Sequence, residues 1–469
     1  MKIQNSLTDK VEEFEPINGG LVSIYTCGPT VYDEVHIGNL SSFIYADTLA
    51  KTLKLKSRVK HVMNITDVDD KTIKRSQELY PHDEPKGALA KLTKDYEAKF
   101  KSDISKINID PDNYIFIRAT ESIQLMQDLI SKLLKTDFAY LADDGIYFSI
   151  NQYINSGKKY GKLVKLDLSN GDSSKSRIDN DEYDKQTIHD FALWKFKKDD
   201  EPSWSYIIDG NDYEGRPGWH IECSAMSVSE LNQPFDIHTG GIDLKFPHHE
   251  NEIAQSTTGN LDYLAKIFFH SEHLFIDSQK MSKSLNNFTT LSDIAKHVSD
   301  PVSFRLLVLQ SNYKNRADFS LDNLKAAYSR LLSYKNFSAL RYQLDDENSF
   351  ETFDFKHVKS EITKAMDDDL NTPKALAELS VFTNLVENSQ INTDQADEFE
   401  DFINFLDDIF GFGLIDVDDI DDIHKGQLKI RLEKRLNKDW SDSDAIREKL
   451  LSDSIGIIDT DKQQIWYRV

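Results

Sequence analysis

Four side chains in the sequence have the chemistry of metal ligands. Cys27 and Cys223 are the only two cysteines of 469 residues, and His248 and Glu252 stand four residues apart directly after Pro247. Proline is favoured at the first position of a helix, and residues four apart share one helix face. Two thiolates, an imidazole and a carboxylate match the donor types that zinc binds. From these residues alone, however, two buried free thiols and an ordinary helical His–Glu pair are the stronger interpretation.

Two further strings have the chemistry of phosphate binding. His36-Ile37-Gly38-Asn39 precedes a helical pattern, and a helix N-terminus offers free amide donors and the positive end of a dipole. Gly38 lets a nucleotide approach the backbone closely. Lys280-Met281-Ser282-Lys283-Ser284 places two lysines in a loop, where each follows a migrating phosphate as a point charge. The first string alone is a weak signal, whereas the second is rare in an ordinary basic loop.

The elements that must position these residues follow from periodicity. Residues 21–27 and 59–66 are apolar and rich in β-branched side chains, which predicts strands, and helical spacing follows Asn39. Strand, glycine turn, helix and strand form a βαβ unit, the building block of a parallel sheet. Because ligands bind beyond the carboxyl ends of parallel strands, we expect Cys27, His36 and Thr66 to lie at that edge.

Later segments predict more sheet and then mostly helix. Strand patterns return at residues 235–238 and 266–276, and a helical bundle is expected over residues 356–411. The final stretch, residues 454–469, has the pattern of short strands. Residues 169–185 are polar and rich in turn formers, and we interpret them as a loop within an inserted domain.

The charge balance taken alone argues against nucleic-acid binding. The net charge is −24, whereas contact with phosphates requires Lys and Arg. Local patches matter more than totals: residues 394–422 are acidic, but residues 425–438 carry six Lys and Arg against one Glu. We predict a local basic surface over residues 425–438, although two solvated helix faces are the simpler interpretation.

Cysteine content and hydropathy bear on the compartment. Two cysteines are too few for a disulfide scaffold, which favours a reducing, cytoplasmic location. The first twenty residues are polar, so no signal peptide is expected, and no apolar run reaches membrane-spanning length. We therefore expect no membrane partner.

Together, the two phosphate-binding strings resemble the HIGH and KMSKS signatures of class I aminoacyl-tRNA synthetases. Further motifs resemble the cysteinyl-tRNA synthetase family: YTCGPTVYD (25–33), NITDVDDK (64–71), GRPGWHIECSAM (215–226), FDIHTGGIDLKFPHHENEIAQS (235–256), AMDDDLNTP (365–373) and NKDWSDSDAIR (437–447). The resemblance runs from the N-terminus to the final residues. It implies an α/β fold with a Rossmann-like parallel-sheet catalytic domain and an inserted connective domain, followed by a helical bundle and a small C-terminal anticodon-binding domain.

The resemblance also implies domain boundaries. They are 1–115 for the first half of the catalytic domain, 116–210 for the inserted connective domain, 211–303 for the second half with the zinc site and KMSKS loop, 304–424 for a helical stem-contact and bundle domain, and 425–469 for the anticodon-binding region.

Each candidate residue receives a role from the resemblance. Cys27, Cys223, His248 and Glu252 match the family's zinc ligands, so one Zn²⁺ per chain is expected, with the substrate thiol as a further ligand. The remaining roles are catalytic for His36, Asn39, Lys280 and Lys283, ATP-binding for Gly38, Gly241, Asp243, Lys280 and Lys283, cysteine-binding for Thr66, Trp219 and His238, and anticodon-binding for Trp440, Asp444 and Asp461.

Two positions depart from the family pattern. Asn39 stands where the family has the second histidine of HIGH; it still donates a hydrogen bond but cannot become cationic. Asn286 stands where the family usually has glycine, and asparagine is the side chain that best tolerates a left-handed backbone.

The implied reaction is ATP-dependent ligation of L-cysteine to tRNA(Cys) through a cysteinyl-adenylate, with Mg²⁺ carried by ATP. The enzyme is expected to be a monomer. Three alternatives stay open. The chain could be a zinc-dependent ligase that joins cysteine to a small amine, a non-catalytic regulator that binds nucleotide and zinc, or a protein whose zinc is purely structural. The NKDWSDSDAIR motif argues against the first, and Lys280 and Lys283 argue against the second.

Overall fold

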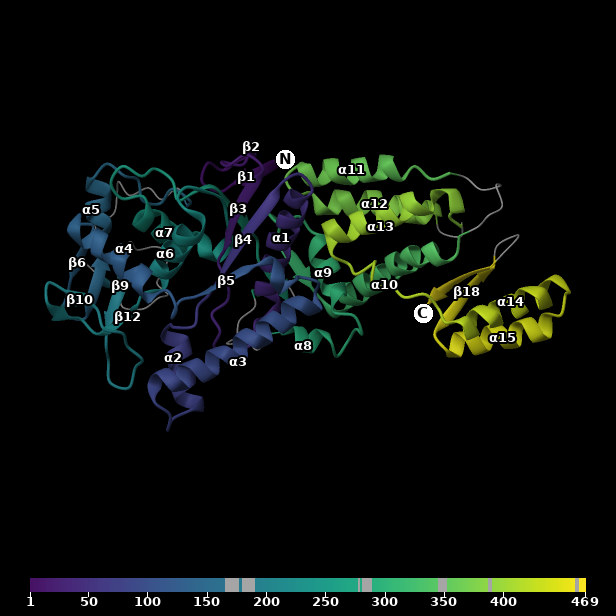
Figure 1. The fold of residues 1–469 in the computed structure, drawn as a ribbon, viewed down its shortest axis with the longest axis horizontal. Helices are drawn as coiled ribbons and strands as arrows, with labels where there is room; N and C mark the ends of the chain where they lie inside the picture. The colour runs from purple at the N-terminus through teal and green to yellow at the C-terminus, as the bar shows by residue number, and fades with distance from the viewer. Residues whose placement is uncertain are drawn as a thin grey trace. The chain divides into compact units, whose positions relative to one another are not determined.

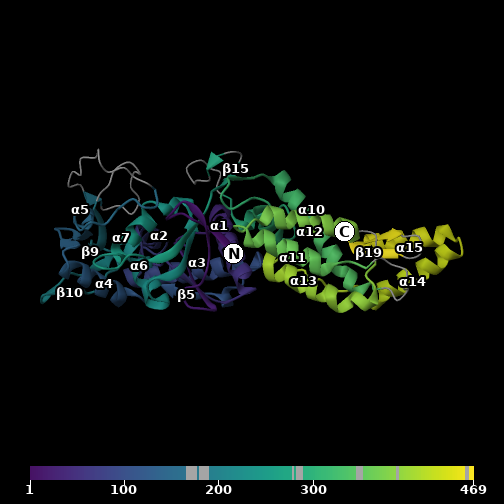
Figure 2. The same ribbon diagram turned by 90° about the horizontal axis from the view of Figure 1, so that it is seen from above.

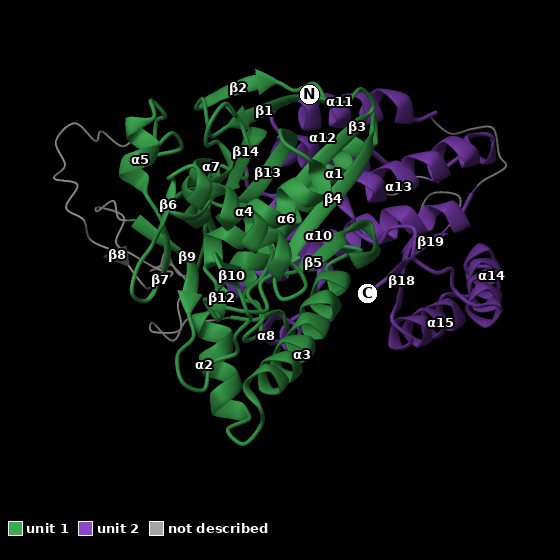
Figure 3. Cartoon of the chain, turned by 60° about the vertical axis from the view of Figure 1, so that its left-hand side comes forward, with its two compact units in different colours: residues 1–291, 313–318 green, residues 292–312, 319–469 purple. Residues whose placement is uncertain are grey.

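The computed structural model describes residues 1–164, 177–178, 190–276, 279–280, 289–344, 352–386, 390–459 and 464–469; at 177–178 and 279–280 only the backbone is described. These residues form two compact units, coloured separately in Figure 3. Unit 1 contains residues 1–291 and 313–318, and unit 2 contains residues 292–312 and 319–469.

Five parallel strands form the central sheet of unit 1, in the order β14–β13–β3–β4–β5. They are β3 (Leu21–Thr26), β4 (Arg58–Ile65), β5 (Ile115–Arg118), β13 (Phe235–Gly241) and β14 (Ala265–Ser271). Strand β3 is buried along nearly its whole length, as is typical of a parallel strand covered on both faces. The predicted parallel sheet is confirmed. The single strand expected over residues 266–276 is two, because β15 (Leu274–Ile276) leaves the sheet to pair with β16 (Gln279–Lys280) and β17 (Ala317–Phe319).

Helix α1 (Ile37–Lys54) connects β3 to β4 and completes the predicted βαβ unit. It begins after His36, whose Nδ1 accepts a hydrogen bond from the backbone N–H of Asn39 at 3.2 Å. The other helices of unit 1 are α2 (Asp70–Leu79), α3 (Pro85–Lys106), α4 (Ile123–Lys135), α5 (Ile150–Asn155), α6 (Trp219–Leu231) and α7 (His248–Ser256).

Between β5 and β13 the chain leaves the parallel sheet and builds a second, mainly antiparallel one. Its order is β12–β9–β7–β6, with β8 beside β9. The strands are β6 (Ala139–Leu141), β7 (Gly145–Phe148), β8 (Arg177–Ile178), β9 (Asp190–Phe196) and β12 (Gly215–Pro217). Two separate hairpins join β1 (Lys2–Asn5) to β2 (Lys10–Glu13) and β10 (Ile207–Ile208) to β11 (Asn211–Asp212).

Unit 2 is mostly helical, as predicted. Helices α11 (Phe355–Asp367), α12 (Thr372–Val386) and α13 (Ala396–Phe410) lie side by side (Figures 1 and 2) around aromatic side chains, with the rings of Phe382 and Phe402 5.5 Å apart. The remaining elements are α9 (Val302–Leu309), α10 (Leu321–Ser338), α14 (Asp422–Leu436), α15 (Trp440–Ser452), β18 (Ile455–Asp459) and β19 (Gln464–Arg468), with the short α8 (Leu291–Ile294) at the junction. Among the described helices, none is long and apolar enough to span a bilayer.

Candidate metal centre and nucleotide site

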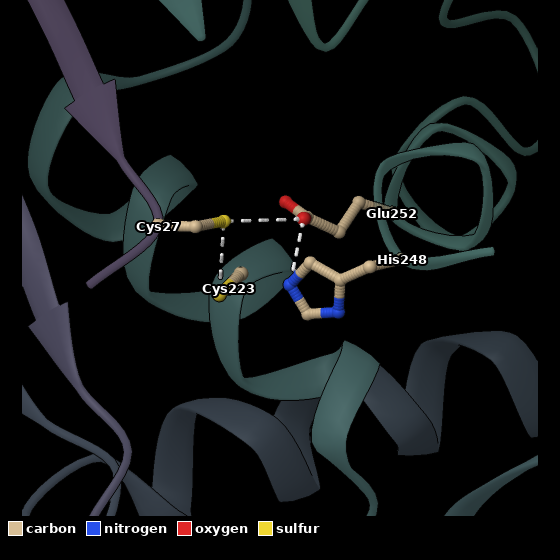
Figure 4. Close-up of side chains that lie close together, drawn as sticks. All are labelled: Cys27, Cys223, His248 and Glu252. Atoms are coloured by element: carbon tan, nitrogen blue, oxygen red, sulfur yellow. Dashed lines mark hydrogen bonds and ion pairs between the residues drawn. The ribbon is translucent and has the colours of Figure 1, made fainter. Parts of the chain in front are cut away.

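Three elements of unit 1 bring the four predicted zinc ligands together. Cys27 directly follows β3, Cys223 lies one helical turn after the start of α6, and His248 and Glu252 occupy one face of α7. Figure 4 shows the side chains converging from these elements. One donor atom from each residue lies within 4.8 Å of the others, and all four side chains are buried. Residues separated by up to 225 positions in the chain therefore share one small volume.

Three of the distances between the donors are close to the edges of a tetrahedron around one ion. The two sulfur atoms are 3.7 Å apart, Cys27 Sγ is 3.7 Å from Glu252 Oε1, and His248 Nε2 is 3.1 Å from the same oxygen. Ordinary Zn–S, Zn–N and Zn–O bond lengths in a tetrahedral site give edges of about 3.3–3.8 Å. The two edges that involve Cys27 fall within this range and the His248–Glu252 edge is slightly shorter, so the cluster fits zinc in its donor types and is compact enough to share one ion.

The electrostatics show why these groups suit a cation. Burial raises the pKa of the Cys27 thiol well above its ordinary value, and the nearby Cys223 and Glu252 act in the same direction. Burial also lowers the pKa of His248 to about 3, so its imidazole is neutral at physiological pH. A divalent cation reverses the effect on the thiol by stabilising the thiolate, and it accepts the lone pair of a neutral imidazole.

Four more histidines surround the cluster. His248 Nδ1 lies 2.9 Å from Nδ1 of His220, and His238 Nε2 lies 2.8 Å from Glu252 Oε2. Such partners orient ligand side chains in metal sites. His249 Nε2 lies 3.3 Å from Cys27 Sγ, and its Nδ1 lies 2.8 Å from Nε2 of His270.

A second donor set overlaps the first. Cys27 and Glu252 also group with His238 and His249 within 4.8 Å. The two sets share Cys27 and Glu252, so a single ion takes one set or the other. The set that contains both cysteines is the better zinc site, because zinc favours thiolate ligands.

A cavity of about 300 Å³ opens beside the cluster and extends to the N-terminus of α1. Seven of the predicted site residues line it: Cys27, His36, Gly38, Asn39, Trp219, Gly241 and Asp243. The Trp219 ring stacks on His248 with the ring centroids 4.2 Å apart, so the cavity wall and the metal cluster are in direct contact. At Gly241 a Cβ atom would lie 2.6 Å from Asp243 Oδ1, so the absence of a side chain there leaves room for the carboxylate.

The N-terminus of α1 is the predicted phosphate site. The backbone N–H of Ile37 donates to Thr289 at 3.0 Å, and His36 pairs with Thr290 as an isolated bridge. The described residues that follow the KMSKS string therefore bind the HIGN string directly. Lys283 and Asn286 lie outside the described residues, and only the backbone of Lys280 is described.

Thr66 and His238 are buried and are not among the residues that line the cavity. Thr66 is 1% exposed and donates to Glu222 Oε2 at 3.1 Å, while His238 is fully buried against Glu252. In this structure Thr66 contacts Glu222, and His238 contacts the candidate metal ligand Glu252. Their direct contact with a substrate stays a prediction.

Curated relatives match nearly the whole chain. A cysteine–tRNA ligase of Leptospira interrogans is 37% identical over 485 residues, covering 99% of each chain. Those of Brachyspira hyodysenteriae and Finegoldia magna are each 37% identical and cover 98% or more of both chains. The sequence profile of the tRNA synthetases class I (C) catalytic domain matches residues 13–329, and a DALR domain profile matches residues 361–414. The chain belongs to the cysteine–tRNA ligase family of class I tRNA synthetases.

Solved structures agree on the fold. The ternary complex of Agrobacterium radiobacter LeuRS with tRNA and LeuAMS aligns with a TM-score of 0.59, covering 86% of each chain. Mycobacterium tuberculosis methionyl-tRNA synthetase with methionyl-adenylate aligns with a TM-score of 0.57, covering 85% of this chain and 93% of the other. At 11% identity, these likenesses establish the class I synthetase fold.

The structure also places residues at the site that the sequence interpretation left out. Lys71, Asp33, Ser42 and His273 line the same cavity. His249 contacts the metal cluster, and a signal for it was present: it stands three residues before Glu252, a spacing that also shares a helix face. No comparable local signal marks Ser42 or His273, because their positions depend on how separate elements pack.

Two of the three predicted anticodon-binding residues, Trp440 and Asp444, lie among the described residues of unit 2. Trp440 begins α15 and is 54% exposed, with the Arg435 guanidinium 5.7 Å from its ring centroid. Asp444 is exposed on the same helix, and Asp461 lies outside the described residues. An exposed aromatic ring beside a cation has the character of a surface that stacks unpaired bases.

Acidic side chains neutralise much of the basic run at residues 425–438. Arg431 is 1% exposed and binds Asp459 through two hydrogen bonds of 2.7 and 2.9 Å. Lys434 pairs with Asp439 and Asp442 at the surface. The expected basic surface therefore depends on fewer cations than the sequence count implies, and it stays a prediction.

Proposed function

We propose that this chain ligates L-cysteine to tRNA(Cys) in two ATP-dependent steps, with one zinc ion that selects the substrate thiol. The convergence of Cys27, Cys223, His248 and Glu252 beside the cavity that contains the HIGN string is the observation that carries this proposal. It joins a thiol-selective centre to a nucleotide site in a chain of the cysteine–tRNA ligase family.

Selection of cysteine over serine is the hardest task of the site. The two amino acids differ by one atom, and a pocket contact that misses one small group discriminates by only about 1–3 kcal/mol. A zinc ion held by the four ligands would supply the missing discrimination, because it prefers thiolate to hydroxyl. Trp219, stacked on His248, then closes the wall of the cavity beside the bound side chain.

In the first step the cysteine carboxylate attacks the α-phosphorus of ATP, and pyrophosphate leaves as the cysteinyl-adenylate forms. Negative charge spreads over the phosphates, where the N-terminus of α1, His36 and the Mg²⁺ carried by ATP stabilise it. Lys280 and Lys283 add positive charge from the KMSKS string. Asn39 donates a hydrogen bond, while Gly38, Gly241 and Asp243 hold the nucleotide.

In the second step a ribose hydroxyl at the tRNA terminus attacks the adenylate carbonyl, and AMP leaves. In class I enzymes this is the 2′-hydroxyl. No side-chain nucleophile is needed, so positioning and electrostatic stabilisation account for the rate. Trp440, Asp444 and Asp461 are proposed to contact the anticodon, and the exposed cations of residues 425–438 the tRNA backbone. The monomeric state and the cytoplasmic location also stay predictions.

The proposal is tested by aminoacylation of tRNA(Cys) with cysteine or serine, with and without a chelator. We expect transfer of cysteine alone, with loss of activity on chelation and recovery on addition of Zn²⁺. Unchanged selectivity in metal-free protein would remove the basis of the proposal.

Two further measurements separate the alternatives. Cysteine-dependent ATP–pyrophosphate exchange without transfer to tRNA would favour the small-amine ligase, and no exchange at all would favour a regulator. X-ray absorption at the zinc edge tests a purely structural metal, because substrate cysteine would then leave the coordination unchanged.

A further inference from the structure

Helix α7 carries buried polar side chains on two opposite faces. His248 and Glu252 point toward Cys27 (Figure 4). Because an α-helix turns by about 100° per residue, the side chain of Glu250 leaves the helix about 180° away from the direction midway between those two. Glu250 therefore holds the helix from the side opposite the metal cluster.

The carboxylate of Glu250 is 1% exposed and accepts three backbone hydrogen bonds. Its Oε1 accepts from the N–H groups of Gly161 at 2.7 Å and Lys162 at 2.9 Å, and its Oε2 accepts from Leu163 at 2.8 Å. Three charge-assisted hydrogen bonds from consecutive amides hold the carboxylate in one position. A buried carboxylate without such donors would strongly destabilise the fold.

A second contact joins the same turn to the helix between the two ligands. The hydroxyl of Tyr160 donates to Asn251 Oδ1 at 2.5 Å, and both side chains are buried. The Tyr160 ring also meets the edge of Phe246, just before the helix begins, at a centroid distance of 6.3 Å. Residues 160–163 thus restrain α7 against both rotation and translation.

We propose that Glu250, with Tyr160, is a positioning residue of the metal centre. The hydrogen bonds from residues 160–163 to Glu250 and Asn251 set the rotation of α7 about its axis. This rotation sets the positions of His248 and Glu252 relative to the two cysteines. Metal affinity in this chain is therefore controlled from a turn that belongs to the segment inserted between β5 and β13. The inference rests on the proposed zinc site.

Metal titration of Glu250→Gln tests the inference. The substitution keeps the shape of the side chain but replaces one acceptor oxygen with a donor that faces amide donors. Mutation of a group that hydrogen-bonds directly to a metal ligand lowers metal affinity about 10- to 100-fold. Glu250 acts instead on the helix that carries two ligands, and we expect the lower end of that range, about tenfold, for Zn²⁺ measured against a chromophoric chelator. The thiolate-to-cobalt absorption of the Co²⁺-loaded protein should shift as well, since it reports ligand geometry. Wild-type affinity with an unchanged cobalt spectrum would overturn the inference.

A matched tyrosine pair keeps the test valid if Glu250→Gln fails to fold. Tyr160→Phe and Tyr153→Phe each remove one buried hydroxyl that contacts α7 or its end, but Tyr153 binds Thr257 at the C-terminal cap, at 2.7 Å. We expect Tyr160→Phe to weaken Zn²⁺ binding several-fold more than Tyr153→Phe, at similar melting temperatures of the metal-free proteins. Equal affinities of the two variants would contradict the inference. Failure of the wild-type protein to bind Zn²⁺ would instead contradict the proposed function.

Discussion

The candidate metal centre of unit 1 and the α14–α15 region of unit 2 use buried polar groups in opposite ways. In the metal centre, two thiols, an imidazole and a carboxylate converge, and the ion-pair partners that the described residues offer Glu252 are histidines. In the α14–α15 region, the buried Arg431 meets the carboxylate of Asp459. One cluster is a set of electron-pair donors, and the other is a matched pair of charges.

This difference indicates a ligand-binding role for the first region and a stabilising role for the second. Donors that face one another repel unless a cation joins them, so their convergence indicates a ligand. Opposite charges that face one another neutralise each other without a ligand, so their convergence indicates a role in stability. Removing a residue should therefore abolish binding in the first region and reduce stability in the second.

The largest effect is expected for Cys223→Ser. Loss of a direct ligand should weaken Zn²⁺ binding by more than the roughly 100-fold limit seen for supporting contacts, and cysteine-dependent ATP–pyrophosphate exchange should fall with it. Ser227→Ala, a buried change on the same helix, is the control and should preserve both. Full cysteine activation by a metal-free Cys223→Ser protein would contradict the assignment.

Arg431→Met should act on stability alone. The change removes the buried cation that pairs with Asp459. Arg435 still contacts the carboxylate at 3.1 Å, so Asp459 keeps part of its positive surroundings. We expect a loss of about 3 kcal/mol, the lower end for breaking a buried pair, in urea unfolding of unit 2. Lys434→Met removes a surface pair and should cost less than about 1 kcal/mol. Equal losses for the two variants would remove the contrast between a buried and an exposed pair.

The smallest expected effect is a difference in pH dependence between Zn²⁺ affinity in the first region and the free energy of unfolding in the second. The raised pKa of Cys27 means that metal binding must displace a proton, whereas His248, with a pKa of about 3, does not compete above about pH 4. Zn²⁺ affinity should therefore rise with pH near neutrality, by about tenfold per unit for each thiol proton displaced. Titration with a chelator buffer measures this slope, and a flat profile would argue against thiol ligands.

The Arg431–Asp459 pair should respond in a different pH window. The contact with Arg431 lowers the pKa of Asp459, so the stability that this carboxylate contributes is present above its ordinary value of about 3.9. That contribution is lost only as the pH falls through the lowered pKa. Near neutral pH, the contribution of this pair to the stability of unit 2 should therefore stay constant while metal affinity changes.

Much of the fold was predictable because its signals are local. The strands at residues 21–27 and 59–66, the helix after the HIGN string and the helical character of residues 356–411 follow from periodicity over a few residues. The parallel sheet follows from the order of those elements. The strand at 266–276 was only partly right, because the change of sheet after Ser271 depends on pairing with β17, about forty positions later.

The candidate site was predictable in its residue types but not in its geometry. The sequence by itself determined that two thiols, a His–Glu pair on one helix face and a phosphate-binding helix start exist in this chain. Only the tertiary structure decided that the thiols lie 3.7 Å apart and that Thr66 and His238 contact buried carboxylates instead of lining the cavity. The physical reason is range: helix and strand preferences arise between neighbours along the chain, whereas a metal centre depends on the packing of segments that the sequence separates by more than two hundred residues.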